Sequence, residues 1–170
     1  VPKTTAKKLI SMGVIDDVTL TYTKNSAVFK SAEYTIYTRL IEGKYFAYQK
    51  MFTEGEINTC VSRTALIGAM TRAKMCTEEK QPAVFQIEDD VLNISIRDKL
   101  ADYQEQVPLQ ETVCKSIRLG FDSRLVLETL KAFTCDNIAL GFTSPRTPMI
   151  VEAEDSDMKA MVLPVAIREV

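Results

Sequence analysis

The residues of this chain that could do chemistry are few, and histidine is absent from all 170 positions. Without histidine, neither a Ser-His-Asp nor a Cys-His nucleophile system can be built, and the commonest general base is missing. The sequence also contains no GxGxxG and no GxxxxGK[ST] segment, so the usual phosphate-binding loops are absent. We therefore predict that the protein is not an enzyme.

Two groups of residues could bind a metal ion. The four cysteines form no CxxC pair, and a zinc site would need all of these scattered thiolates as ligands, namely Cys60, Cys76, Cys114 and Cys135. We interpret them as small buried or half-buried thiols in a reducing cytosol. Four carboxylates could bind a divalent cation and are the best support for an enzyme: Glu152, Glu154, Asp155 and Asp157. The alternative, which we favour, is a charged hairpin turn, so we expect no metal and no cofactor.

Composition restricts the partners. The net charge is −2 and the pI is about 5.3, so the whole chain has no general attraction to nucleic acid or to anionic membranes. No apolar run is long enough to span a bilayer and no charged-then-apolar leader is present, which predicts a soluble, cytoplasmic protein. A nucleic-acid role must come from a local basic surface or from topology.

Three segments are expected to be helices that would position such a surface. They are 4–13, 62–75 and 122–133, and each opens with a residue that can cap a helix, Thr4, Ser62 or Asp122. Apolar residues follow at three-to-four spacing in three stripes: Ala6, Leu9 and Ile10; Leu66, Ile67, Met70 and Ala73; Val126, Leu127, Leu130 and Phe133. The starts lie roughly 60 residues apart, which suggests an internal repeat.

The segments around each helix also repeat. Short strands at 58–61 and 116–121 precede the second and third helices, and strands with alternating apolar residues follow each one. The expected later strands are 83–87, 91–96 and 102–113, with a turn at Asp89 and Asp90, and then 137–143, 149–154 and 158–167. One strand-helix-three-strand unit cannot cover its own apolar face, so two must pack together. No linker separates the units, so we expect shared continuous sheets, and we expect residues 1 to about 55 to leave apolar surface exposed.

Five segments of the chain, taken in order, resemble segments of a known protein family. They are RLIEGKYFAY (39–48), RTALIGAMTRAKMCTEEKQPAVFQI (63–87), GFDSRLVLETLKAF (120–133), FTSPRTP (142–148) and MVLPVAI (161–167). In this order and spacing the chain resembles the bacterial DNA polymerase III beta subunit, the replicative sliding clamp. The resemblance covers the second half of that family's middle domain, here 1–55, and its C-terminal domain, here 56–170.

The resemblance implies an α+β clamp fold made of repeated β-α-β-β-β units, with helices on the inner face and antiparallel sheets outside. It implies a non-catalytic processivity factor in DNA replication: a homodimeric ring that encloses double-stranded DNA non-specifically and tethers DNA polymerase III and other clamp-binding proteins, with no membrane partner. Eight basic residues on or beside the helices would then face DNA: Lys3, Lys7, Lys8, Arg63, Arg72, Lys74, Arg124 and Lys131.

The resemblance also implies a hydrophobic cleft for client peptides. Carried over by position, its residues are Phe46, Lys50, Met51, Gln81, Asp122, Leu125, Arg146, Pro148, Leu163, Pro164, Val165, Ala166 and Ile167. The sequence departs from the family where Phe46 replaces a proline, Ala47 replaces an acid and Ala166 replaces an arginine, and the Asp-Gly-His-Arg-Leu stretch of the middle domain is missing. The seam of the ring would lie at Met75 and Cys76.

Pro145 and Pro148 bracket an Arg-Thr pair in a segment that would otherwise continue a strand. Proline cannot donate a ladder hydrogen bond, so this segment should leave the sheet and expose side chains. It is either the rim of the peptide cleft or an edge-strand breaker that prevents aggregation. Our reading of the whole chain is part of a sliding clamp; the alternative is a standalone interaction module with the clamp fold that does not encircle DNA.

Overall fold

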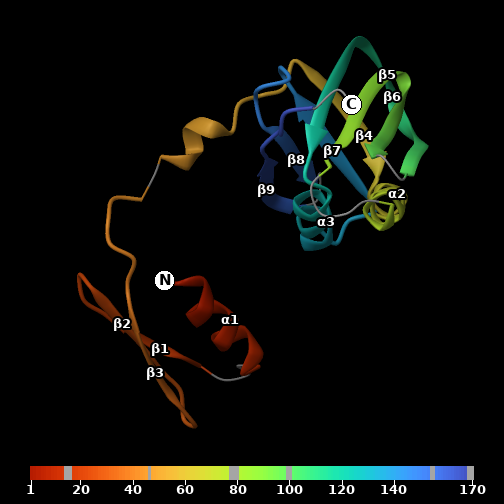
Figure 1. Cartoon of the computed structure of the whole chain (residues 1–170). Helices are drawn as coiled ribbons and strands as arrows, with labels where there is room; N and C mark the ends of the chain where they lie inside the picture. The colour runs from red at the N-terminus through yellow and green to blue at the C-terminus, as the bar shows by residue number, and fades with distance from the viewer. Residues whose placement is uncertain (14–16, 46, 77–80, 99–100, 154–155, 168–170) are drawn as a thin grey trace. The chain divides into compact units, whose positions relative to one another are not determined.

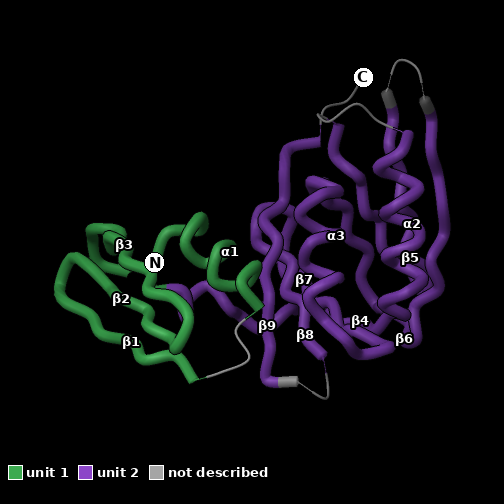
Figure 2. Tube along the Cα trace, turned by 90° about the horizontal axis from the view of Figure 1, so that it is seen from below, with its two compact units in different colours: residues 1–47 green, residues 48–170 purple. Residues whose placement is uncertain are grey.

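The computed structural model describes the chain except residues 14–16, 46, 77–80, 99–100, 154–155 and 168–170. The chain divides into two compact units, residues 1–47 and 48–170 (Figure 2). In the part of the chain that is described, no helix is long and apolar enough to cross a membrane.

Unit 1 is one helix and one small sheet. Helix α1 (Lys3–Ser11) is followed by the antiparallel sheet β1-β2-β3, formed by Thr19–Tyr22, Ser26–Lys30 and Thr35–Arg39 (Figure 1). The hydroxyl oxygens of Thr5 and Thr38 lie 2.9 Å apart and link α1 to β3. No residue of α1 is buried. The cap expected at Thr4 was wrong, because the N-cap is Pro2 and makes no side-chain hydrogen bond.

The exposure of unit 1 follows the expectation for an uncovered repeat. Strand register places Leu20, Phe29 and Ile36 on one face, and Tyr22 lies on the same face two residues further along β1. On that face Leu20 is 51% and Tyr22 is 73% exposed, and Ile10 on the helix is 80% exposed. One helix over three strands is too small to cover its own apolar face.

Unit 2 has a six-stranded sheet in the order β5-β6-β4-β7-β8-β9. It is formed by Ala83–Asp98, Ala101–Phe121, Ile57–Ser62, Asn137–Phe142, Met149–Ala153 and Ser156–Val162, and a short 3-10 helix, η1 (Tyr48–Met51), precedes it. All strand pairs are antiparallel. The expectation of a continuous sheet is confirmed within unit 2, but unit 1 has a sheet of its own.

Two long strands replace the shorter ones expected from the sequence. The turn expected at Asp89 and Asp90 was wrong: β5 runs through these residues with two register shifts, and Asp89 has a φ of 52°. An extra residue in one strand bends it without ending it, as a β-bulge does. The segments expected as 102–113 and 116–121 are likewise one strand, β6, which ends the first repeat of the unit and begins the second.

Helices α2 (Arg63–Met75) and α3 (Ser123–Ala132) pack side by side against the sheet (Figures 1 and 2). The expected caps are confirmed: the Ser62 hydroxyl accepts a hydrogen bond from the backbone N–H of Ala65, and the Asp122 carboxylate accepts from Arg124 and Leu125. The core lies between helices and strands and includes the expected stripes, with Leu66, Met70, Ala73, Val126, Leu127, Leu130 and Phe133 buried. Helix α2 packs against β4, β5, β6 and α3, and α3 also contacts β9, whereas no residue of α1 is buried.

Candidate functional site

A groove forms where the C-terminal segment of the chain joins strand β6. The backbone N–H of Val165 donates to the carbonyl oxygen of Gly120, 2.8 Å away, in an isolated antiparallel bridge. A Cβ atom at Gly120 would lie 2.8 Å from the carbonyl oxygen of Val165 and 3.1 Å from Ile167. Only glycine therefore lets the terminal segment approach this closely.

The turn between β7 and β8 forms another wall of the groove. The backbone N–H of Thr147 donates to the carbonyl oxygen of Ser144 at 3.2 Å, and its side-chain hydroxyl accepts from the backbone N–H of Ser144 at 2.9 Å. Strand β7 has ended at Phe142, and Pro145 and Arg146 are exposed. The segment leaves the sheet, as the two prolines predict.

The groove has a volume of about 460 Å³ and brings together part of the expected cleft. Its lining consists of Arg118, Leu119, Gly120, Pro145, Arg146, Pro164, Val165, Ala166 and Ile167. Five of these were expected from the sequence: Arg146, Pro164, Val165, Ala166 and Ile167. The aliphatic groups among these residues give a surface that suits an apolar peptide side chain.

Other expected cleft residues lie elsewhere in unit 2. Asp122 caps helix α3 through Arg124 N–H at 2.8 Å, and Leu125, in the first turn of α3, is 43% exposed. Leu163 is 58% exposed and Pro148 is half-buried, but neither lines the groove. Lys50 and Met51 are exposed on η1. Phe46 lies outside the described residues, and these positions remain predictions.

Three lining residues, Arg118, Leu119 and Gly120, were missed by sequence reasoning, while Pro145 belongs to the segment that was expected as a possible rim. Alternation along 116–121 does carry a signal, because Ile117, Leu119 and Phe121 face the core and so Arg118 and Gly120 must face outward. No signal in the sequence indicates the backbone bridge between Gly120 and Val165, which lies 45 positions later in the chain.

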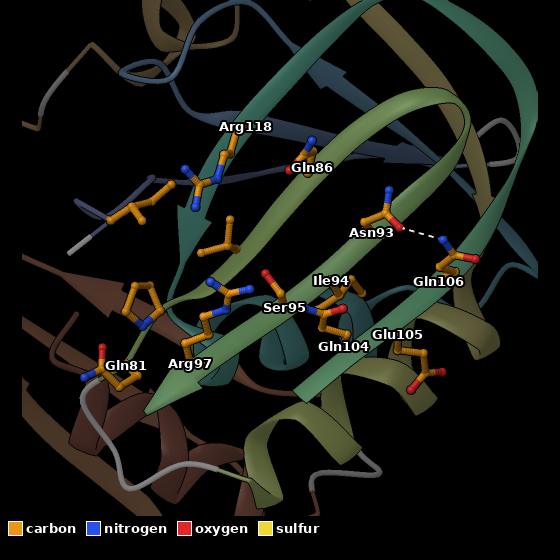
Figure 3. A pocket seen from close by; sticks show the side chains of 13 residues that line it. Gln81, Gln86, Asn93, Ile94, Ser95, Arg97, Gln104, Glu105, Gln106 and Arg118 are labelled. Atoms are coloured by element: carbon orange, nitrogen blue, oxygen red, sulfur yellow. Dashed lines mark hydrogen bonds between the residues drawn. The ribbon is translucent and has the colours of Figure 1, made fainter. Parts of the chain in front are cut away.

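A second hollow, here called the trough, adjoins the groove. It has a volume of about 930 Å³ and lies over β5 and β6 (Figure 3). Its lining consists of Gln81, Pro82, Val84, Gln86, Asn93, Ile94, Ser95, Arg97, Gln104, Glu105, Gln106, Arg118 and Ile167. Arg118 and Ile167 line both hollows, so the two meet at these side chains. Gln81, expected in the cleft, lies in the trough.

Three of the basic residues expected to face DNA bind other parts of unit 2. The Arg63 Nε donates to the carbonyl oxygen of Cys135 at 2.5 Å. Arg72 forms a bidentate ion pair with Glu105 on β6: its Nε donates to Oε2 at 2.9 Å and its Nη2 donates to Oε1 at 2.5 Å. Arg124 approaches the carboxylate of Asp122 at 3.5 Å. A guanidinium already paired with a carboxylate contributes less to binding phosphate than a free one.

The Arg72 pair belongs to a small network. The Tyr103 hydroxyl donates to the Glu105 carboxylate and lies 3.0 Å from the carbonyl oxygen of Ala69 on α2. Hydrogen bonds from Arg72 and then Tyr103 lower the pKa of Glu105 from 4.5 to about 2. Partial burial, followed by the hydrogen bond to Glu105, raises the pKa of Tyr103 to about 12. Glu105 therefore stays ionised and paired at neutral pH, and the network ties α2 to β6.

The remaining basic residues are exposed. Lys74 on α2 and Lys131 on α3 make no ion pair with any described residue, and Lys3, Lys7 and Lys8 are exposed on α1. On α2 and α3, Lys74 and Lys131 are therefore the basic residues for which no partner is found among the described residues. Their placement toward DNA remains a prediction.

Three further groups can be placed. Met75, expected at the ring seam, is 82% exposed at the end of α2, and Cys76 is half-buried. In the expected carboxylate cluster Glu152 pairs with Lys159 at 2.8 Å, while Glu154 and Asp155 lie outside the described residues. Cys60 and Cys135 are half-buried as expected, but Cys114 is exposed on β6, which corrects that expectation.

Comparison with known proteins identifies relatives of the chain. It is 24% identical over 155 residues to the beta sliding clamp of Staphylococcus aureus, covering 88% of this chain and 41% of that protein. It is 25% identical over 140 residues to the beta sliding clamp of Halalkalibacterium halodurans, covering 79% of this chain and 37% of that protein. The chain thus spans about two fifths of the curated relatives it matches.

Solved structures show the fold. The DNA polymerase sliding clamp from Pseudomonas aeruginosa matches 98% of this chain and 47% of its own, with a TM-score of 0.88 at 20% identity. The sliding clamp from Bacillus subtilis matches 99% of this chain and 46% of its own, with a TM-score of 0.88 at 16% identity. The expected α+β clamp fold is confirmed.

The family model described as DNA polymerase III beta subunit, C-terminal domain, matches residues 51–166. These residues contain the whole sheet of unit 2, both of its helices and most of the groove. Sliding clamps are a non-catalytic family of DNA replication factors. The chain therefore belongs to the DNA polymerase III beta subunit family, the bacterial sliding clamps.

Proposed function

We propose that this chain acts as part of a cytoplasmic sliding clamp, a processivity factor that encircles DNA and tethers polymerases and repair proteins. The groove at the C-terminus is the observation that carries the tethering role. It combines aliphatic groups of the terminal segment with the guanidinium of Arg146, which is exposed and forms no ion pair with a described residue, beside strand β6. A short peptide can bind there by inserting apolar side chains, without any chemistry being performed on it.

The first experiment tests the groove. We expect the double variant Val165→Ala with Ile167→Ala to bind a labelled peptide with two adjacent leucines about tenfold more weakly, because apolar anchor contacts are lost. Fluorescence anisotropy measures the affinity, and circular dichroism checks that the fold is retained. A matched control, Ile10→Ala with Leu20→Ala, removes two exposed apolar side chains from unit 1. Equal affinity in both double variants would contradict a groove that binds peptides.

The DNA part of the proposal is supported by the two repeats of unit 2. Helices α2 and α3 lie side by side, and the lysines at 74 and 131 are exposed on them. A ring holds DNA by enclosing it, so its inner surface needs only enough positive charge to avoid repelling phosphates. This is how a protein with a net charge of −2 can act on DNA.

The second experiment tests that surface. We expect Lys74→Gln with Lys131→Gln to weaken binding of the full chain to a short duplex. The slope of log affinity against log salt should fall by about 2, since about 0.9 counterions are released per phosphate contact. The control, Lys115→Gln with Lys159→Gln, removes two lysines on strands that already pair with Glu56 and Glu152. An unchanged slope in the α2 and α3 double variant would argue for a clamp-fold module that does not face DNA.

A further inference from the structure

The groove and the trough meet at two shared side chains, Arg118 and Ile167, so one bound peptide can reach both. Strand β6 presents Arg118 at their junction, and Gln86 lies opposite it on β5 (Figure 3). Arg118 is exposed and makes no ion pair with any residue that the structure describes. Ile167 also lines both hollows, so Arg118 and Ile167 mark the place where the groove and the trough meet.

The carboxylates near the trough do not neutralise Arg118. Glu105 lines the trough but is held by Arg72 through two hydrogen bonds. Asp102 lies 3.8 Å from Arg97 at the far end of the hairpin. Glu88 accepts a hydrogen bond from Gln86 at 2.6 Å. The junction therefore has one positive charge without a partner among the described residues, and a carboxylate is the ligand that a guanidinium binds best.

Apart from Arg118, and from Arg97 and Glu105, which pair with Asp102 and Arg72, the polar residues that line the trough are uncharged. Asn93 and Gln106 face each other across β5 and β6, and the Gln106 amide donates to the Asn93 side-chain oxygen at 3.0 Å (Figure 3). Ser95 and Gln104 form the next pair along the strands. Carboxamides both donate and accept hydrogen bonds, as an extended peptide backbone requires. Nucleic acid would instead need several free cations for its phosphates.

We propose that the trough binds an acidic segment of the same client peptide whose apolar residues occupy the groove, with Arg118 binding its carboxylate at the junction. This inference rests on the peptide-binding role of the groove. It adds a specificity that the apolar lining alone does not give, because a carboxylate beside the anchor gains a charge-assisted hydrogen bond that a neutral residue does not. The partner is thus a clamp-binding protein whose tail combines leucine-like and acidic residues.

The experiment compares two acetylated and amidated hexapeptides, Glu-Glu-Leu-Leu-Glu-Glu and Gln-Gln-Leu-Leu-Gln-Gln, at low ionic strength. We expect the acidic peptide to bind the full chain about tenfold more tightly, as for a hydrogen bond between charged groups. The preference should decrease with added salt. In Arg118→Gln the two peptides should bind almost equally, through loss of affinity for the acidic peptide alone.

The matched control is Lys115→Gln, which removes one positive charge from the same strand, three positions away and outside both hollows. It should retain the preference for the acidic peptide. If both peptides bind the unmodified chain equally, or if Arg118→Gln keeps the preference, the acidic subsite is wrong while the groove stands. If neither peptide binds, the groove itself is refuted, and this inference with it.

Discussion

Replacing Phe85 with alanine is expected to lower the free energy of unfolding of unit 2 by about 3–5 kcal/mol, the usual cost of truncating a buried phenylalanine. Phe85 on β5 is fully buried, and its ring packs edge-to-face on Phe121 with centroids 5.2 Å apart. Phe121 ends β6 immediately before the cap of α3. The ring pair therefore joins the two repeats at the centre of the core.

Urea unfolding followed by far-ultraviolet circular dichroism measures this effect, since the chain has no tryptophan to report on it. The control is Phe52→Ala, which removes the same side chain from a half-buried position where it contacts Tyr48 with centroids 6.5 Å apart. We expect a cost of about 1 kcal/mol or less there. Similar losses in both variants would mean that Phe85 is not a central core residue.

Gly120→Val is expected to reduce the affinity of the groove for an apolar peptide about a hundredfold. A Cβ atom there would lie 2.8 Å from the backbone carbonyl oxygen of Val165, and backbone cannot yield as a flexible side chain can. Overpacking of this kind costs about 3 kcal/mol at its upper range. The terminal segment would have to leave β6, which removes one wall of the groove while β6 keeps its pairing with β5 and the core side chains are unchanged.

Gly68→Ala is the matched control for this substitution. Its added Cβ atom would meet only the guanidinium of Arg72, at 3.3 Å, which can move aside. Alanine in a helix interior is favoured over glycine by about 1 kcal/mol, so this variant should be as stable as the parent or more so. Anisotropy with the leucine peptide measures binding, and the smaller variant Gly120→Ala is the fallback if valine unfolds the protein. Normal peptide binding by both Gly120 variants would show that the bridge to Val165 does not shape the groove.

Local sequence signals predicted the elements of the fold well. Ser62 and Asp122 cap α2 and α3 because a short polar side chain can reach the free N–H groups of the first turn. The stripes on both helices are buried, since three-to-four spacing places apolar residues on one face. The internal repeat predicted that two neighbouring strand-helix-strand repeats share one sheet, and the two repeats of unit 2 do so.

Signals that depend on partners distant in sequence failed. Two adjacent aspartates indicate a turn, but Asp89 forms a bulge because β6 is long enough to pair on both sides of it. The DNA-facing surface expected from basic residues on the helices stays a prediction, but the helix pattern gave no sign that Arg72 pairs with Glu105, 33 positions away. One local signal was also wrong: Thr4 could cap a helix, yet the helix begins one residue earlier at Lys3, after Pro2.

The sequence by itself determined the helices, the strand faces, the repeat and the membership of the clamp family, because each depends on neighbours or on regular spacing. Tertiary structure alone decided which charges are free and where the groove lies. Arg118 becomes a candidate binding residue only because the segment after β9 returns to Gly120 beside it. That approach is a contact between backbones, and residue types at separate places in a sequence do not encode which backbones will meet.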